Sequence, residues 1–175
     1  KDVTFCEPIV YHYPQKGNQK LKHRIVVVGF GPAGMFAGLL LAQMGYRPYI
    51  IERGGDIETR SKDVEAFWQQ GCLNPESNVS FGEGGAGAFS DGKLTARSKD
   101  PRVRRVLEEL CRLGAPEEIL YEAHPHIGTD LLCGIVKKIR EEIIAYGGEV
   151  RFQSCLENIE YEDGTLKRLC INGEW

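Results

Sequence analysis

The pattern Gly-x-Gly-x-x-Gly over residues 29–34 constrains the fold of this chain more than any other feature of its sequence. It overlaps the end of a β-branched run, Arg24–Gly29, which predicts a buried strand of the kind found in parallel sheets. Residues 32–45 predict a helix that is apolar on nearly every side and therefore needs neighbours on more than one side. A second strand is expected over 47–52. A strand, a helix and a strand within about 30 residues form a βαβ unit.

The rest of the sequence extends this unit into an α/β fold, with a Rossmann-like parallel sheet and a C-terminal antiparallel hairpin. A length of 175 residues corresponds to one domain, at about 150 residues per domain. Residues 1–23 show no regular period and are expected to form an extended lead-in, so the domain is assigned to residues 24–175. Three further helices are expected. The first covers 57–70, with Val64, Phe67 and Trp68 buried, the second covers 101–113, and the third runs from a cap at Thr129 or Asp130 to 146. A third parallel strand is expected over 149–152 and the hairpin over 156–171.

Charge, hydropathy and cysteine spacing exclude several classes of partner and site. The formal net charge is −3, so no strong field favours nucleic acid or an anionic membrane. The longest strongly apolar stretch, Met35–Met44, is far shorter than the roughly 20 residues of a membrane-spanning helix. No two of the six cysteines are closer than 15 residues, so the sequence contains no Cys-x-x-Cys pair. The even number would permit three disulfides, but Cys111 and Cys133 fall among the apolar positions of expected helices, which favours reduced thiols in a cytoplasmic protein. His124 and His126 lack further ligands at zinc-binding spacing, which favours a solvated turn over a metal site.

The glycine pattern points to nucleotide binding because of where it lies. Between a strand and a helix, its first glycine permits a tight turn, its second lets a pyrophosphate approach the backbone, and its third lets the helix pack close to the strand. The helix then directs its unpaired N–H groups at the phosphates. Glu52, at the end of the second strand, is placed to accept hydrogen bonds from both ribose hydroxyls.

These features predict a site for NAD(H) or for the ADP half of FAD. A carboxylate at position 52 repels a 2′-phosphate, which disfavours NADP. The alternative is a glycine-rich turn that binds nothing, with Glu52 an ordinary surface acid. A second cluster, of five glycines over residues 82–92, indicates another stretch of backbone that closely approaches something, or else a mobile surface loop.

Two parts of the sequence resemble known flavoproteins. Residues 25–38, followed by 50–54, resemble the opening of FAD domains of the glutathione-reductase type, including the small residue Gly38 four positions after the last glycine. Residues 81–94 (FGEGGAGAFSDGKL) and 124–130 (HPHIGTD) resemble signatures of bacterial FAD-dependent dehydrogenases of the NAD(FAD)-utilising family. The resemblance covers nearly the whole chain.

The resemblance implies an oxidoreductase that uses FAD, with NAD(H) as a candidate co-substrate. It also implies an N-terminal region, a substrate or cap region and a late segment of the flavin site that are not read in this sequence, so a fragment of a longer flavoprotein, truncated at its C-terminus, is expected. Two alternatives stay open: an NAD-dependent dehydrogenase without flavin, and a non-catalytic nucleotide-binding module. Glu83 and Asp91 are weak candidates for a general base, since lone acids in a polar loop are mostly solvated. The sequence assigns no catalytic residue, substrate or oligomeric state.

The candidate cofactor contacts fall into two groups. In the first, the backbone of residues 29–34 contacts the pyrophosphate, Glu52 the ribose and Arg53 the adenine. In the second, the glycine-rich backbone forms an anion-binding nest, Ser90 bonds a phosphate or flavin oxygen, and Lys93 lies near the pyrophosphate or the flavin N1–C2=O edge. The full set is Gly29, Phe30, Gly31, Pro32, Ala33, Gly34, Glu52, Arg53, Gly85, Ala86, Gly87, Ser90 and Lys93.

Overall fold

The computed structural model describes residues 4–5, 10–94 and 98–175. Its framework is a parallel sheet of three short strands, β1 (Val26–Val28), β2 (Tyr49–Ile51) and β3 (Glu149–Arg151). The strands lie in the order β1-β2-β3, so β2 is hydrogen-bonded on both edges. Because parallel strands need crossover connections, β1 and β2 are joined through a helix, as the glycine pattern predicts.

A separate antiparallel hairpin follows the parallel sheet. It pairs β4 (Leu156–Glu162) with β5 (Thr165–Ile171) through a turn at Asp163-Gly164, where both residues have positive φ. Asn, Asp and Gly adopt this backbone conformation more readily than other residues, which explains why the chain reverses there. The predicted α/β class, with parallel strands followed by a hairpin, is confirmed.

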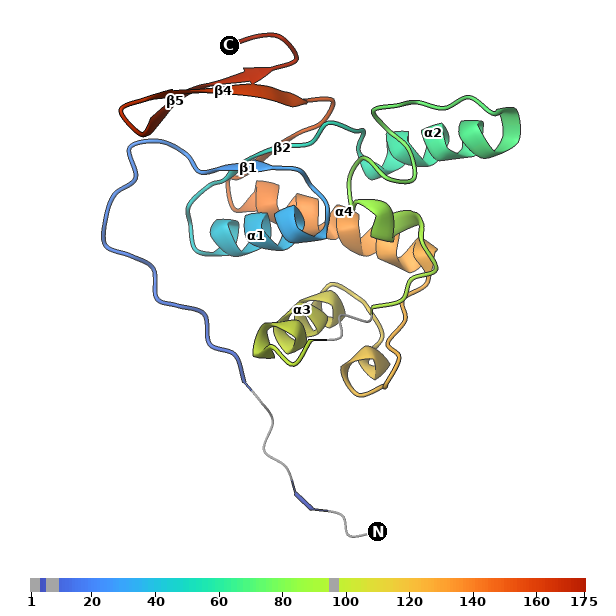
Figure 1. Ribbon diagram of the computed structural model, residues 1–175. Helices are drawn as coiled ribbons and strands as arrows, with labels where there is room; N and C mark the ends of the chain where they lie inside the picture. Colours follow the sequence, from blue (N-terminus) through green and yellow to red (C-terminus); the bar gives the residue numbers. More distant parts are fainter. Residues whose placement is uncertain (1–3, 6–9, 95–97) are drawn as a thin grey trace.

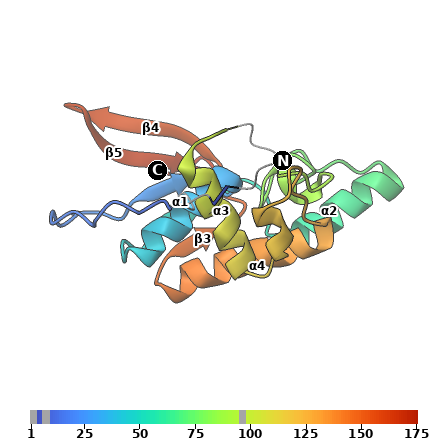
Figure 2. The same ribbon diagram turned by 90° about the horizontal axis from the view of Figure 1, so that it is seen from below.

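Helices cover the parallel sheet on the face away from the hairpin (Figure 1). Two of them, α1 and α4, lie side by side against this face, and α2 extends toward the end of the molecule opposite the hairpin in both views (Figures 1 and 2). The helices are α1 (Pro32–Gln43), α2 (Ile57–Gln70), α3 (Pro101–Arg112) and α4 (Thr129–Ala145), with short 3₁₀ turns η1 (Ala86–Phe89) and η2 (Glu117–Leu120).

The hydrophobic core lies between the sheet and the pair α1 and α4. Ile50 of β2 is fully buried, and it faces Leu39 of α1 and Ile143 of α4, which are also buried. Fully burying one such side chain contributes about 1.5–3 kcal/mol of transfer free energy. The inward face of α4 is formed by four buried residues, Ile135, Val136, Ile139 and Ile143.

Two local expectations are wrong. Of the three residues expected to be buried in α2, Val64 is buried, but Trp68 is 66% exposed and Phe67 is also exposed. The other buried residues of that helix are Ile57 and Arg60. The cap of α4 is Gly128, and no side chain accepts a capping hydrogen bond there, so neither Thr129 nor Asp130 has the expected role. By contrast, α2 begins and ends at the predicted residues. The side chain of Asp100 caps α3 by accepting a hydrogen bond from the amide of Arg102.

The described part of the chain contains no membrane-spanning helix, no disulfide and no metal-binding group. None of its helices combines the length and the apolar character needed to cross a membrane. The five cysteines in this part of the chain, Cys72, Cys111, Cys133, Cys155 and Cys170, are free thiols, and Cys6 lies outside the described residues. Within the same residues, no group of His, Cys, Asp and Glu side chains is arranged to hold a metal ion, His124 and His126 included.

Two glycines inside helices provide a matched test of how the sheet and α1 fit together. A Cβ at Gly34 would lie 1.9 Å from the carbonyl oxygen of Gly29, whereas a Cβ at Gly134 would meet nothing within 4 Å. We expect Gly34→Ala to lower the free energy of unfolding by about 1–3 kcal/mol, since backbone must move. Gly134→Ala is expected to raise it by about 0.5–1 kcal/mol, since alanine favours helix. Urea denaturation measures both, and equal effects would contradict this packing.

Candidate functional site

The turn between β1 and α1 brings the first glycine cluster to the carboxyl ends of the strands. Gly29 has φ +89°, and its amide donates to the carbonyl of Ile51 at 2.7 Å, which ties the turn to the end of β2. Gly31 is the N-cap of α1, and no side chain caps this helix. The first N–H groups of an α-helix have no partner within the helix, so the amides at this end are directed toward the space in front of the turn.

The second glycine cluster packs directly against the first. The amide of Gly84 donates to the carbonyl of Phe30 at 2.9 Å. A Cβ at Gly85 would lie 3.2 Å from the Cα of Gly31, so any side chain would wedge the two segments apart. Gly82 and Gly84 are buried, which means that this part of the cluster is not a surface loop. The structure thus brings together two segments that are separated by about fifty residues.

The two clusters enclose a cavity of about 350 Å³ at the carboxyl ends of β1 and β2. An adjoining cavity of about 520 Å³ shares Arg53 and Cys155 with it. Ligands of α/β proteins bind outside the carboxyl ends of parallel strands, so the position is typical of a ligand site. The smaller cavity is lined by Val28, Gly29, Gly31, Ile51, Glu52, Arg53, Ser80, Phe81, Gly82, Gly85, Ser154, Cys155 and Leu156.

Glu52 lines this cavity and is 5% exposed, so it is not an ordinary surface acid. Its Oε2 accepts a hydrogen bond from the amide of Phe30 at 2.7 Å, and its Oε1 accepts one from the amide of Gly54 at 2.8 Å. Each carboxylate oxygen can accept two hydrogen bonds, so both retain capacity for a further donor. Glu52 therefore fixes the glycine turn and still presents acceptors to a ligand.

Arg53 lies at the boundary between the two cavities. Its guanidinium stacks over the ring of Phe81, 4.5 Å from the centroid, and forms an ion pair of 2.7 Å with Glu76. The hydrogen bond to Glu76 raises the pKa of Arg53 above its usual value. A planar guanidinium at this position can stack on a flat ring, since Arg favours contacts with aromatic faces.

Ser90 and Lys93, the last two residues of the predicted set, do not line this cavity. Ser90 donates to the carbonyl of Gly87 at 2.9 Å and lines a different cavity, of about 520 Å³, with Phe89 and Cys133. Lys93 is exposed and pairs with Asp91 at 2.7 Å, and this contact raises the pKa of Lys93 and lowers that of Asp91. Asp91 is thus solvated, as expected. The remaining two, Ala86 and Gly87, begin η1 beside the cavity.

Arg60 supports the site from behind, and the sequence did not point to it. It is fully buried, and its guanidinium donates to the carbonyls of Asn78 at 2.8 Å, Val79 at 3.1 Å and Glu83 at 2.6 Å. Burial lowers the pKa of Arg60 to about 10, which leaves it charged at neutral pH. One guanidinium on α2 therefore holds the backbone that carries the second glycine cluster. Its position among polar helix residues gave no signal of this role.

Glu83 was expected to be solvated, and this expectation is wrong. Its side chain is fully buried: Oε2 accepts from the amide of Ile57 at 2.7 Å and pairs with Arg140 at 3.1 Å, whereas Oε1 has no partner among the described residues. Burial raises the pKa of Glu83 to about 7. Arg140 on α4 has only 13% of its side chain exposed because it pairs with Glu83. The carboxylate acts from within the fold as the connection of the glycine loop to α2 and α4.

The raised pKa of Glu83 makes stability depend on pH. The pKa is about 7 in the folded chain against an ordinary value of 4.5, so the folded form binds the proton more tightly. The free energy of unfolding therefore falls as pH rises from about 4.5 to about 7, by up to about 3 kcal/mol from this group. We expect Glu83→Gln, which cannot ionise, to lose less stability than the unmodified chain between pH 5 and pH 8.

Urea denaturation at several pH values measures this difference. Glu65→Gln, on an exposed face of α2, is the matched control and is expected to leave the pH dependence unchanged. A Glu83→Gln variant whose stability follows the same pH curve as the unmodified chain would show that Glu83 does not titrate in this range.

Comparison with known proteins adds a homologue without an assigned function. No family model matches the chain. An uncharacterized protein of Clostridium beijerinckii is 57% identical over 174 residues, which are 99% of this chain and 33% of that protein. The chain thus spans about a third of the length of this relative. Among solved structures, the crystal structure of Thermovibrio ammonificans THI4 is similar with a TM-score of 0.48 and 19% identity, over 85% of this chain and 47% of that one.

Proposed function

We propose that this chain is the nucleotide-binding part of an FAD-dependent oxidoreductase. The observation that carries the proposal is the single cavity formed by both glycine clusters and the buried carboxylate of Glu52. The resemblance of residues 25–38 and 81–94 to FAD domains adds to it, because the motif that resembles flavoproteins most specifically is the one that packs on the glycine turn.

The residues present fit the pyrophosphate of such a cofactor. The uncapped amides of α1 and the positive end of its dipole favour a negative charge in front of the turn. Gly31 and Gly85 border this space without a side chain, so phosphate oxygens can approach the backbone. Ala33 and Gly34, in the first turn of α1, supply the donors, whereas Pro32 has no N–H to offer.

The adenosine end fits the side of the cavity lined by Glu52 and Arg53. The remaining acceptor capacity of Glu52 suits the two ribose hydroxyls, and its charge opposes a 2′-phosphate. The guanidinium of Arg53, at the entrance to the adjoining cavity, suits the flat adenine. FAD, when bound, supplies the capacity to accept hydride, and the protein positions it. The flavin end, the redox substrate and NAD(H) as co-substrate belong to the proposal for the longer protein.

Binding measurements with adenine nucleotides test the proposal. We expect the protein to bind FAD and ADP, and to bind 2′,5′-ADP at least about tenfold more weakly than ADP, because Glu52 repels the 2′-phosphate. Glu52→Ala is expected to weaken ADP binding by about 10- to 100-fold, as for loss of a charged hydrogen bond. Isothermal titration calorimetry measures each affinity, and Glu65→Ala is the control.

The alternatives predict different results. An NAD-dependent dehydrogenase without flavin would bind NADH in this cavity and show no affinity for FAD, and a non-catalytic module would bind ADP and FAD without flavin reduction in the longer protein. Equal affinity for ADP and 2′,5′-ADP would contradict the role of Glu52 even if Glu52→Ala fails to fold.

A further inference from the structure

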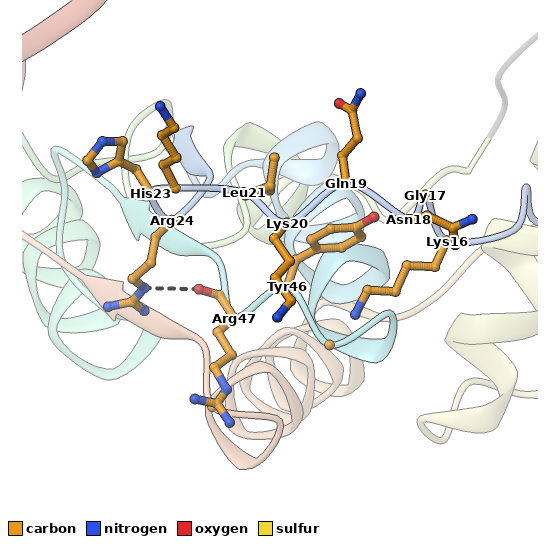
Figure 3. A pocket seen from close by; sticks show the side chains of 13 residues that line it. Lys16, Gly17, Asn18, Gln19, Lys20, Leu21, His23, Arg24, Tyr46 and Arg47 are labelled. Carbon is orange, nitrogen blue, oxygen red and sulfur yellow. Dashed lines mark hydrogen bonds between the residues drawn. The ribbon is translucent and has the colours of Figure 1, made fainter.

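A further hollow lies at the opposite ends of the strands from the nucleotide cavity. The lead-in segment over residues 16–24 passes across the turns that precede β2 and β3, and it leaves a space of about 700 Å³ (Figure 3). Arg24 lies two residues before the start of β1 and Arg47 two residues before the start of β2, so this hollow is at the amino ends of the parallel strands. It is therefore separate from the site proposed above and does not depend on it.

The charge of this hollow is one-sided. Of the 13 residues that line it, five are Lys or Arg and none is Asp or Glu, in a chain whose formal net charge is −3. Figure 3 shows the side chains of Lys16 and Lys20 turned toward the turn that carries Tyr46 and Arg47, whereas Gln19 points away. Clustered cations repel one another unless an anion lies among them. The five are Lys16, Lys20, Lys22, Arg24 and Arg47.

Specific contacts hold the wall of the hollow in place. Arg24 donates from Nε to the carbonyl of Arg47 at 3.0 Å and from Nη2 to that of Pro48 at 3.1 Å, and its Nη1 pairs with Glu149 at 2.9 Å. The Nζ of Lys16 lies over the ring of Tyr46, 4.8 Å from the centroid. The lead-in is thus fastened at both ends of the hollow.

Arg47, which lines the hollow, has an unusual backbone conformation. Its φ is +50°, a value that non-glycine residues seldom adopt, and a Cβ at Gly147 would lie 3.4 Å from its Cγ. Such conformations cost free energy and cluster at functional sites. With Arg24 already paired to Glu149, the cations without an ion pair to any described residue are Lys16, Lys20, Lys22 and Arg47.

We propose that this hollow binds a small molecule with two or more phosphate groups. Lysine binds phosphate as a point charge, and several cations around one space suit an anion that carries several charges. The volume is within the range of about 300–1,000 Å³ that is typical of small-ligand pockets. A nucleic-acid backbone fits less well, because the cations are confined to one short segment and one turn, and Glu149 borders them.

Titration with inorganic tripolyphosphate tests this proposal. We expect Lys16→Ala/Lys20→Ala to weaken tripolyphosphate binding roughly tenfold or more, and the affinity to fall with added salt. The matched control is Lys62→Ala/Lys99→Ala, which removes two exposed lysines that do not line the hollow and is expected to change the affinity little.

A further variant and a further ligand distinguish this site from the nucleotide cavity and from a nucleic-acid site. Gly31→Val blocks the glycine turn, where a polyphosphate can also bind, and is expected to leave unchanged the component of tripolyphosphate binding that Lys16→Ala/Lys20→Ala weakens. The proposal is overturned if Gly31→Val abolishes binding while Lys16→Ala/Lys20→Ala does not, or if the two double variants weaken it equally. Tight binding of a single-stranded oligonucleotide, with no measurable binding of tripolyphosphate, would overturn the assignment to a small ligand. Loss of ADP binding in Glu52 variants has no bearing on this result.

Discussion

The amide of Gly84 donates to the carbonyl of Phe30, a backbone-to-backbone contact between the two glycine-rich segments, and the arrangement of the whole site depends on it. Because the two glycine-rich segments meet backbone to backbone, their unobstructed main chain borders one cavity at the carboxyl ends of the strands. Gly34 extends the same principle to the other side of the turn, since its Cβ would overlap the carbonyl oxygen of Gly29. Missing side chains thus determine both where α1 lies and what can approach its N-terminus.

Glycine has no side chain that restricts the backbone, so a glycine-rich segment needs other contacts to fix its conformation. In this protein, buried charged side chains provide those contacts. Arg60 donates to carbonyls on both sides of Phe81, and Glu83 connects the same segment to the amide of Ile57 and to Arg140. Burying an ionised side chain costs free energy unless it is paired and hydrogen-bonded. Arg60 is well satisfied, whereas Glu83 has one carboxylate oxygen without a partner among the described residues, which accords with its raised pKa.

Local sequence patterns predicted the βαβ unit, because the valine run, the glycine spacing and the apolar helix each have a local physical cause. The same patterns predicted that the backbone of the second cluster closely approaches something, but they did not predict that it meets the backbone of Phe30. They failed where burial depends on residues far apart in sequence. Nothing near Glu83 shows that Ile57 and Arg140 will enclose it, and nothing near Arg60 shows that its carbonyl partners begin eighteen residues later. Trp68 shows the opposite error, since an aromatic residue on a helix need not face the core.

Amide-resolved NMR during titration with ADP tests the central claim most directly, namely that the two glycine clusters form one nucleotide site. The account predicts that the amides of Gly29, Gly31, Ala33 and Gly34 shift together with those of Gly82 and Gly85, with a single dissociation constant. It also predicts little change at residues 98–120, which lie outside the cavity. Shifts in the first cluster without any in the second, or shifts in neither, would contradict the account.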